Sequence, residues 1–125
     1  MEVQTKAFEL ALYTIENSLK EKIVPKRDRW SLGEALKEHA LEIASQLDMA
    51  NTMRLDDEEE ARERRLAQRK ALSATFKLAT LIHITRNLTH FDEKVHEHWT
   101  KLVKEEQELL RNWMDSDRKR RRALN

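Results

Sequence analysis

The residues of this sequence best placed for metal chemistry are Glu93 and His96, which form a Glu-x-x-His pair. Helical bundles that hold a di-iron site use two such pairs and two further carboxylates, and a second pair is missing here. His98 does not replace it, because residues two apart on a helix point to different sides. His83 lies in an apolar stretch, where a core or interface histidine is commoner than a ligand or a base. The spacing therefore predicts no metal site.

The groups needed for covalent or nucleotide chemistry are also missing from the sequence. Cysteine is absent, which removes disulfides and thiolate ligands and is typical of a reducing compartment. Gly33 is the single glycine, so the chain has no glycine-rich loop to cradle a phosphate. We therefore predict no catalytic residues, no cofactor and no enzymatic activity.

Clusters of basic residues are the stronger candidates for function. The net charge is only +1, but the cations are unevenly placed. Two clusters stand out in the sequence: Lys26, Arg27 and Arg29, and the run Arg118, Lys119, Arg120, Arg121 and Arg122. Clustered cations bind phosphates by releasing counterions. The arginines between positions 62 and 69 could act in the same way, or could pair with the glutamates between positions 58 and 63 at helical spacing.

Long helices must position these residues, because the chain is poor in the residues that break helices. Its 125 residues include one glycine and one proline, and 38% of them are charged. No segment alternates apolar and polar residues over the length of a strand. The apolar runs are far shorter than the roughly 20 residues of a membrane span, and the N-terminus lacks the features of a secretory signal. We expect a cytoplasmic, all-helical protein that does not enter a membrane.

The first predicted helix runs from about Val3 to about Lys22 and ends before Pro25, which cannot donate a helical hydrogen bond. Its apolar residues recur at spacings of four and three, which places them on one face. We expect this stripe to face the core: Phe8, Leu12, Ile15 and Leu19.

The second predicted helix begins after the loop that carries the first basic cluster. Ser31 and Glu34 have the spacing of a capping box, in which each side chain bonds the backbone amide of the other. Trp30, just before this cap, is placed to pack as a hydrophobic staple onto Ala35.

The third and fourth predicted helices are the longest. The third begins with the acidic run from Asp56 to Glu60, which the helix dipole stabilises. It carries one apolar stripe, and Phe76 with Ile82 widens a second face, which indicates a central helix or a subunit interface. The fourth begins near Glu93. Glu106 interrupts its apolar stripe, and we interpret this residue as part of a salt bridge at a bundle seam or, alternatively, as a contact with a partner subunit.

Short connections between four such helices favour antiparallel neighbours. The sequence therefore predicts an all-α, up-down-up-down antiparallel four-helix bundle. We expect one bundle domain over residues 1–117, followed by a basic C-terminal tail over residues 118–125.

Three stretches of the sequence resemble one family. PKRDRWSLGEAL, at residues 25–36, resembles the turn and second-helix start of the four-helix-bundle family of ribosomal-RNA intervening-sequence proteins. It is more specifically similar to the accessory variability determinant (Avd) proteins of diversity-generating retroelements. ITRNL, at residues 84–88, resembles the family's third helix, with Arg86 at or near its arginine. The family's closing E-x-x-x-L-L-x-x-W pattern is matched by Glu105, Leu109, Leu110 and Trp113.

The chain departs from the family pattern at two places. Gln107, Arg111 and Asn112 stand where the family usually carries glycines. Val24 precedes the proline, where an aromatic residue is usual. The absence of these glycines makes the fourth helix more regular than the resemblance alone would indicate.

The resemblance implies a homopentamer with a basic surface that binds the element's reverse transcriptase and its template RNA, with DNA as a further ligand. Such a protein supports mutagenic cDNA synthesis without being a polymerase. The residues to which we assign nucleic-acid binding on these grounds are Lys26, Arg27, Arg29, Arg86, Arg118, Lys119, Arg120, Arg121 and Arg122. Two alternatives remain: a protein-interaction bundle of the intervening-sequence family that binds no nucleic acid, and a metal-dependent enzyme.

Overall fold

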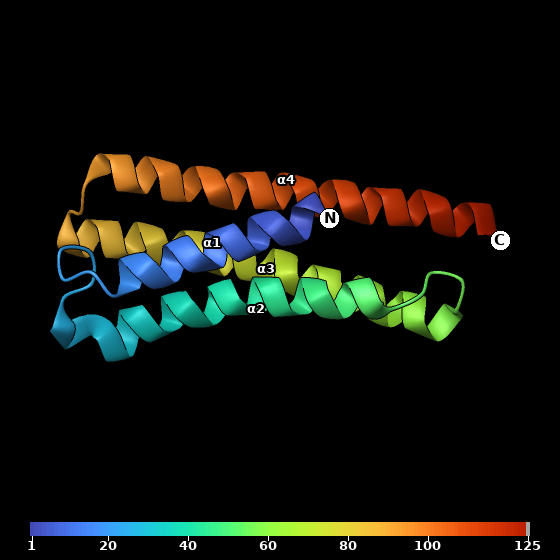
Figure 1. The fold of residues 1–125 in the computed structure, drawn as a ribbon, viewed down its shortest axis with the longest axis horizontal. Coiled ribbons are helices and arrows are strands. Elements are labelled where there is room, and N and C mark those ends of the chain that lie inside the picture. Colours follow the sequence, from blue (N-terminus) through green and yellow to red (C-terminus); the bar gives the residue numbers. More distant parts are fainter. Residues whose placement is uncertain (125) are drawn as a thin grey trace.

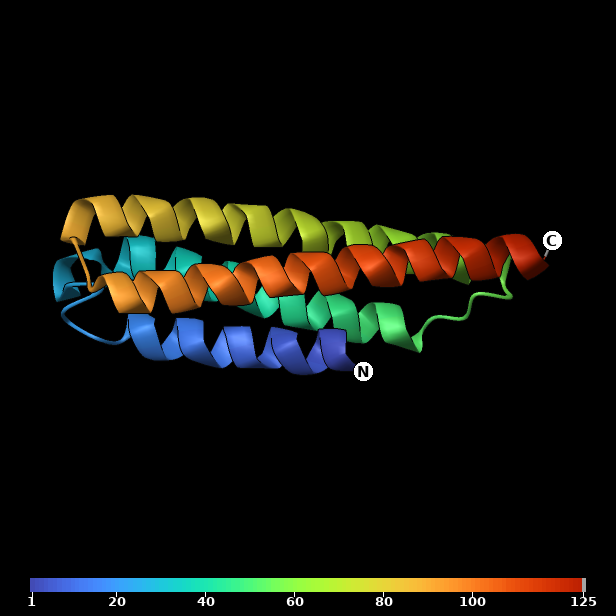
Figure 2. The same cartoon turned by 90° about the horizontal axis from the view of Figure 1, so that it is seen from above.

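The computed structural model describes residues 1–124 and contains four long helices that run alternately up and down (Figures 1 and 2). They are α1 (Glu2–Ser18), α2 (Glu34–Thr52), α3 (Glu58–Thr89) and α4 (Glu93–Leu124). Two short helical turns, η1 (Lys26–Asp28) and η2 (Arg29–Gly33), lie between α1 and α2. The predicted all-α, antiparallel four-helix bundle is confirmed. Over residues 1–124, no helix has the length and apolar character needed to cross a lipid bilayer.

The helices differ in length, and this difference gives the two ends of the bundle different structures. α3 and α4 have 32 residues each, whereas α1 has 17 and α2 has 19. At one end all four helices pack together beside the loop that contains η1 and η2. At the other end α1 begins partway along the bundle, so the start of α3 and the end of α4 extend beyond it (Figure 1).

Aliphatic and aromatic side chains from all four helices fill the core, and Trp99 is the largest side chain that is fully buried. The indole N–H of Trp99 donates a hydrogen bond of 2.9 Å to the hydroxyl oxygen of Thr14, so the polar atom of this buried ring is satisfied. On α1 the residues beside Thr14 are small. Ala7 and Ala11 are both buried, and they let α1 approach its neighbours closely.

The predicted core stripe of α1 was wrong, because α1 is apolar on two faces and the other face is the buried one. The buried face consists of Val3, Ala7, Leu10, Ala11 and Thr14, together with Asn17 and Ser18. Phe8 is 62% exposed and Leu19 is 57% exposed, and Leu12 is exposed as well. The helix also ends at Ser18, whose hydroxyl donates to the carbonyl oxygen of Ile15, and not near Lys22.

The predicted capping box at Ser31 was also wrong. The hydroxyl of Ser31 donates to the carbonyl oxygen of Asp28 and caps no amide of α2. Gly33, which precedes α2, already has helical torsion angles, since the π-helical turn η2 continues directly into α2. The first amides of α2 therefore have backbone partners and need no cap. Trp30 makes no staple, because it is 88% exposed.

The two ends of α3 and the start of α4 lie close to the boundaries predicted from the sequence. Asp57 caps α3 by accepting a hydrogen bond of 3.0 Å from the amide of Glu60, as expected for an acidic helix start. His90 ends α3 in a left-handed conformation. α4 continues without a break from Glu93 to Leu124, so the basic run from Arg118 to Arg122 is helical. Asn125, the last residue of the predicted tail, lies outside the described residues.

Candidate functional site

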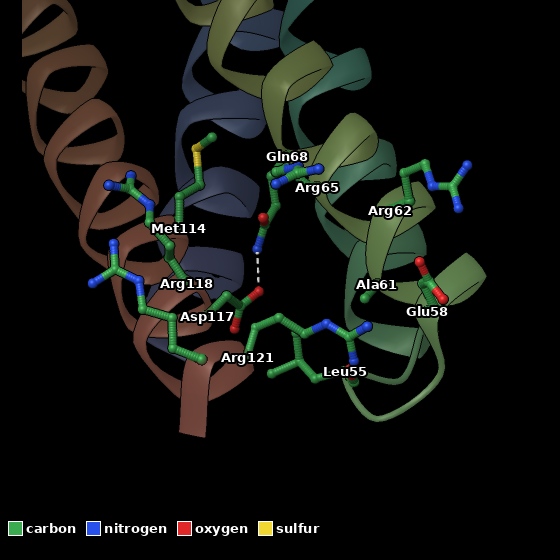
Figure 3. A pocket seen from close by; sticks show the side chains of 11 residues that line it. Leu55, Glu58, Ala61, Arg62, Arg65, Gln68, Met114, Asp117, Arg118 and Arg121 are labelled. Carbon is green, nitrogen blue, oxygen red and sulfur yellow. Dashed lines mark hydrogen bonds between the residues drawn. The ribbon is translucent and has the colours of Figure 1, made fainter. Parts of the chain in front are cut away.

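An open groove of about 340 Å³ lies where the start of α3 faces the end of α4 (Figure 3). Its walls are residues three or four apart on each helix, which is the spacing of one helical face. The lining residues are Leu55, Glu58, Ala61, Arg62, Arg65, Gln68, Met114, Asp117, Arg118, Arg121 and Arg122. Arginines from both helices therefore line one hollow.

A buried ion pair holds the two helices together beside this groove. The guanidinium of Arg64 donates to both carboxylate oxygens of Asp117, with Nε–Oδ2 and Nη2–Oδ1 distances of 2.7 and 3.0 Å. The amide of Gln68 donates to the same carboxylate at 2.8 Å. Arg64 also donates to the carbonyl oxygen of Met53 at 2.9 Å and lies 4.9 Å from the ring centroid of Trp113. Because Arg64 already matches the charge of Asp117, this carboxylate does not neutralise the other cations of the groove.

The remaining arginines of the groove carry more positive charge than their neighbours balance. Arg118 pairs with Asp115 at 2.9 Å, and Arg121 donates to the carbonyl oxygen of Leu55 at 2.7 Å. Arg62, Arg65 and Arg122 form no ion pair with any residue that the structure describes. The alternative in which the early arginines of α3 pair with the glutamates of that helix is thus not the arrangement found. The groove is therefore a concave surface with an excess of guanidinium groups.

The groove brings together only part of the predicted basic tail and adds residues that the sequence did not assign. Arg118, Arg121 and Arg122 line it, whereas Lys119 and Arg120 do not. Arg120 instead lies 3.9 Å from Asp117. Arg62 and Arg65 were not in the predicted set. Their spacing of three on a helix was a signal that they share a face, but the sequence does not say which part of α4 that face meets.

The other predicted basic residues lie at the opposite end of the bundle. The two ends of the bundle are separated by the length of α3, whose 32 residues correspond to about 48 Å. Arg29 donates to the carbonyl oxygen of Leu19 at 2.9 Å, and Arg27 is 3.5 Å from Asp28. The guanidinium of Arg86 lies 5.7 Å from the ring centroid of Phe91. The predicted nucleic-acid residues thus form two separate clusters, one at each end.

Glu106 is fully buried in the core, and neither of its carboxylate oxygens has a hydrogen-bond partner. It forms no salt bridge with any residue the structure describes, so the predicted seam salt bridge is not found. Burial raises the pKa of Glu106 from 4.5 to about 8, and the nearby charge of Lys6 opposes this rise. The carboxyl group is therefore protonated in the folded protein at neutral pH.

Two of the histidines, His96 and His98, take part in aromatic packing, whereas His83, which was expected in the core or at an interface, has an exposed side chain. The ring of His98 meets that of Tyr13 edge-on at a centroid distance of 4.8 Å, and the ring of His96 lies 6.1 Å from that of Phe91. Within residues 1–124, no three side chains among His, Asp and Glu gather closely enough to hold a metal ion.

No protein-family model, curated protein or solved structure matches this chain.

Proposed function

We propose that this protein is a non-enzymatic accessory protein of a diversity-generating retroelement, which binds a reverse transcriptase and its template RNA and supports mutagenic cDNA synthesis. The observation that supports the proposal most strongly is the groove between α3 and α4. Five arginines line it, and among the described residues only Arg118 has an ion-pair partner, while Arg121 bonds a backbone carbonyl. The resemblance of the loop and of the end of the fourth helix to accessory variability determinant proteins points in the same direction.

The chemistry of this groove suits a phosphate backbone. A guanidinium group binds phosphate through paired hydrogen bonds, and clustered guanidinium groups gain affinity by releasing counterions from the nucleic acid. Arg62 and Arg65 on α3 and Arg118 and Arg122 on α4 line the same open groove, so a phosphate backbone lying along it would have cations from two helices nearby. The groove contains no aromatic residue, so the contacts are with the backbone and not with base faces.

Self-association and reverse-transcriptase binding would use a different surface. Phe8 and Leu12 on α1, with Leu19 directly after its last residue, form an exposed apolar ridge. A hydrogen bond of 2.9 Å from Gln4 to Asp48 sets the antiparallel register of α1 and α2, which brings Leu12 near the level of exposed Leu41. Exposed apolar ridges of this kind mark protein–protein contacts. We infer that this face contacts a neighbouring subunit in the homopentamer implied by the resemblance.

The binding proposal can be tested with a fluorescein-labelled RNA hairpin and fluorescence anisotropy. We expect the triple variant Arg62→Gln, Arg65→Gln, Arg122→Gln to bind at least tenfold more weakly than the wild type at moderate salt. The matched control is Lys77→Gln, Lys94→Gln, Lys104→Gln, which removes the same charge from exposed positions outside the groove. Equal weakening of both variants, or of neither, would contradict the role of the groove.

A second candidate function is a protein-interaction bundle that binds no nucleic acid, and the apolar ridge of α1 is the observation that favours it. This candidate predicts that the groove variant retains all partner binding. It also predicts that wild-type protein does not retard RNA at low salt.

A further inference from the structure

Trp30 is the most exposed large apolar residue of the described chain. It is 88% exposed, whereas Trp99 is fully buried and Trp113 is 8% exposed. Tryptophan has the largest side chain, and its exposure leaves an extensive aromatic surface in contact with water. The core of the bundle does not use this ring.

The turn that presents Trp30 is held in place by buried residues and hydrogen bonds. Ile23 and Val24 are buried just before it. A Cβ built on Gly33 would lie 3.6 Å from Cγ1 of Val24, so the turn packs closely on this residue. The guanidinium of Arg29 donates to the carbonyl oxygen of Leu19 at 2.9 Å. The indole therefore projects from an ordered support, which lowers the entropic cost of binding a flat ligand.

Exposed cations precede Trp30 in the same segment between α1 and α2. Lys26 and Arg27 are exposed and lie three or four residues before Trp30 in consecutive helical turns. Lys20 and Lys22 add further exposed positive charge to the preceding segment. Acidic residues are fewer here, because Glu21 and Asp28 are the only ones between α1 and α2. An exposed aromatic face beside several cations is the arrangement that proteins use to bind single strands, by stacking a base while the cations contact phosphates.

We propose that Trp30, Lys26 and Arg27 form a second nucleic-acid site that binds single-stranded RNA or DNA by stacking an unpaired base on the indole. This inference rests on the proposed function. It assigns to the four-helix end of the bundle a different task from that of the groove: the groove contacts backbone phosphates, whereas the Trp30 turn recognises a segment whose bases are unpaired.

The test uses three labelled probes: a single-stranded oligouridine, a duplex of the same length, and an abasic oligomer that keeps the phosphates and lacks the bases. We expect Trp30→Ala to weaken binding of oligouridine about tenfold and to leave binding of the duplex and the abasic oligomer unchanged. Trp30→Tyr, which keeps a stacking ring, should restore most of the affinity. Far-UV circular dichroism serves as the folding control, and an exposed side chain should be replaceable without loss of helix.

Tryptophan fluorescence supplies an independent readout, since Trp99 and Trp113 are buried. Oligouridine should quench the emission of the wild type and leave that of Trp30→Tyr unchanged. The inference is overturned if wild-type protein binds the probes and Trp30→Ala binds oligouridine equally well. It is also overturned if Trp30→Ala changes only self-association. Failure of the wild type to bind any of the three probes would instead overturn the proposed function as a whole.

Discussion

Glu106 provides a sharp test of the packing in the core. Its carboxyl group is fully buried without a hydrogen-bond partner, and its pKa is raised from 4.5 to about 8 because burial disfavours the charged form. The unfolded chain releases this proton near the ordinary value, whereas the folded chain holds it until about pH 8. The folded state therefore binds more protons throughout this window, and its stability must fall as the pH rises.

The size of this loss of stability follows from the pH range between the two pKa values of Glu106, 4.5 in the unfolded chain and about 8 in the folded protein. Below pH 4.5 the group is protonated in both states and contributes no slope. Through the window, each pH unit lowers the free energy of unfolding by about 1.4 kcal/mol. We therefore expect a loss of roughly 3 kcal/mol between pH 5 and pH 7 from this residue alone. Above about pH 8 the group is ionised in both states, and the slope from Glu106 disappears.

The assay is urea unfolding followed by circular dichroism at several pH values for the wild type and Glu106→Gln. Glutamine has nearly the same shape as glutamate and does not titrate. The contributions of all other titrating groups to the pH dependence of stability are therefore the same in both proteins and cancel in the difference. We expect the stability of the wild type relative to the variant to fall steadily between pH 5 and pH 8. Parallel stability profiles for the two proteins across this range would refute the burial of an unpartnered carboxyl group at this position.

Three further predictions concern stability and assembly. Asp117→Asn should destabilise the protein by about 3–5 kcal/mol in urea unfolding, because the charge of Arg64 stays buried without its partner; a loss below about 1 kcal/mol would contradict this. Asp57→Ala should cost about 1 kcal/mol through loss of the hydrogen bond to the amide of Glu60, and an unchanged urea midpoint would count against the cap. Leu12→Glu should reduce the molar mass measured by light scattering without loss of helix, and an unchanged oligomer would exclude the α1 ridge as the subunit contact.

The fold could be predicted from the sequence because its signals are local. Proline and the Asp57 cap mark breaks that depend on a few neighbouring residues, and the scarcity of glycine leaves little besides helix. The orientation of α1 was not predictable in the same way. Its two faces are both apolar, and the choice between them depends on contacts with other helices, such as the hydrogen bond between Thr14 and Trp99.

The candidate site was predictable only in part, for a similar reason. The run from Arg118 to Arg122 is visible in the sequence, but its pairing with Arg62 and Arg65 depends on the register of α3 against α4. The bond between Arg64 and Asp117 sets that register, and these residues are 53 positions apart in the chain. The exposure of Trp30 was not predicted, because the sequence pattern of a capping box at Ser31 placed Trp30 as a hydrophobic staple. In the structure η2 continues directly into α2, and no such cap forms.

The central claim, that the groove between α3 and α4 binds nucleic-acid phosphates, is tested most directly by the salt dependence of RNA binding. The logarithm of the binding constant should fall linearly with the logarithm of the salt concentration for the wild type. For the variant Arg62→Gln, Arg65→Gln, Arg122→Gln we predict a slope smaller in magnitude by about 2–3, because each lost phosphate contact removes roughly 0.7–0.9. An identical slope for the two proteins, or a wild type that binds no RNA at low salt, would contradict the claim.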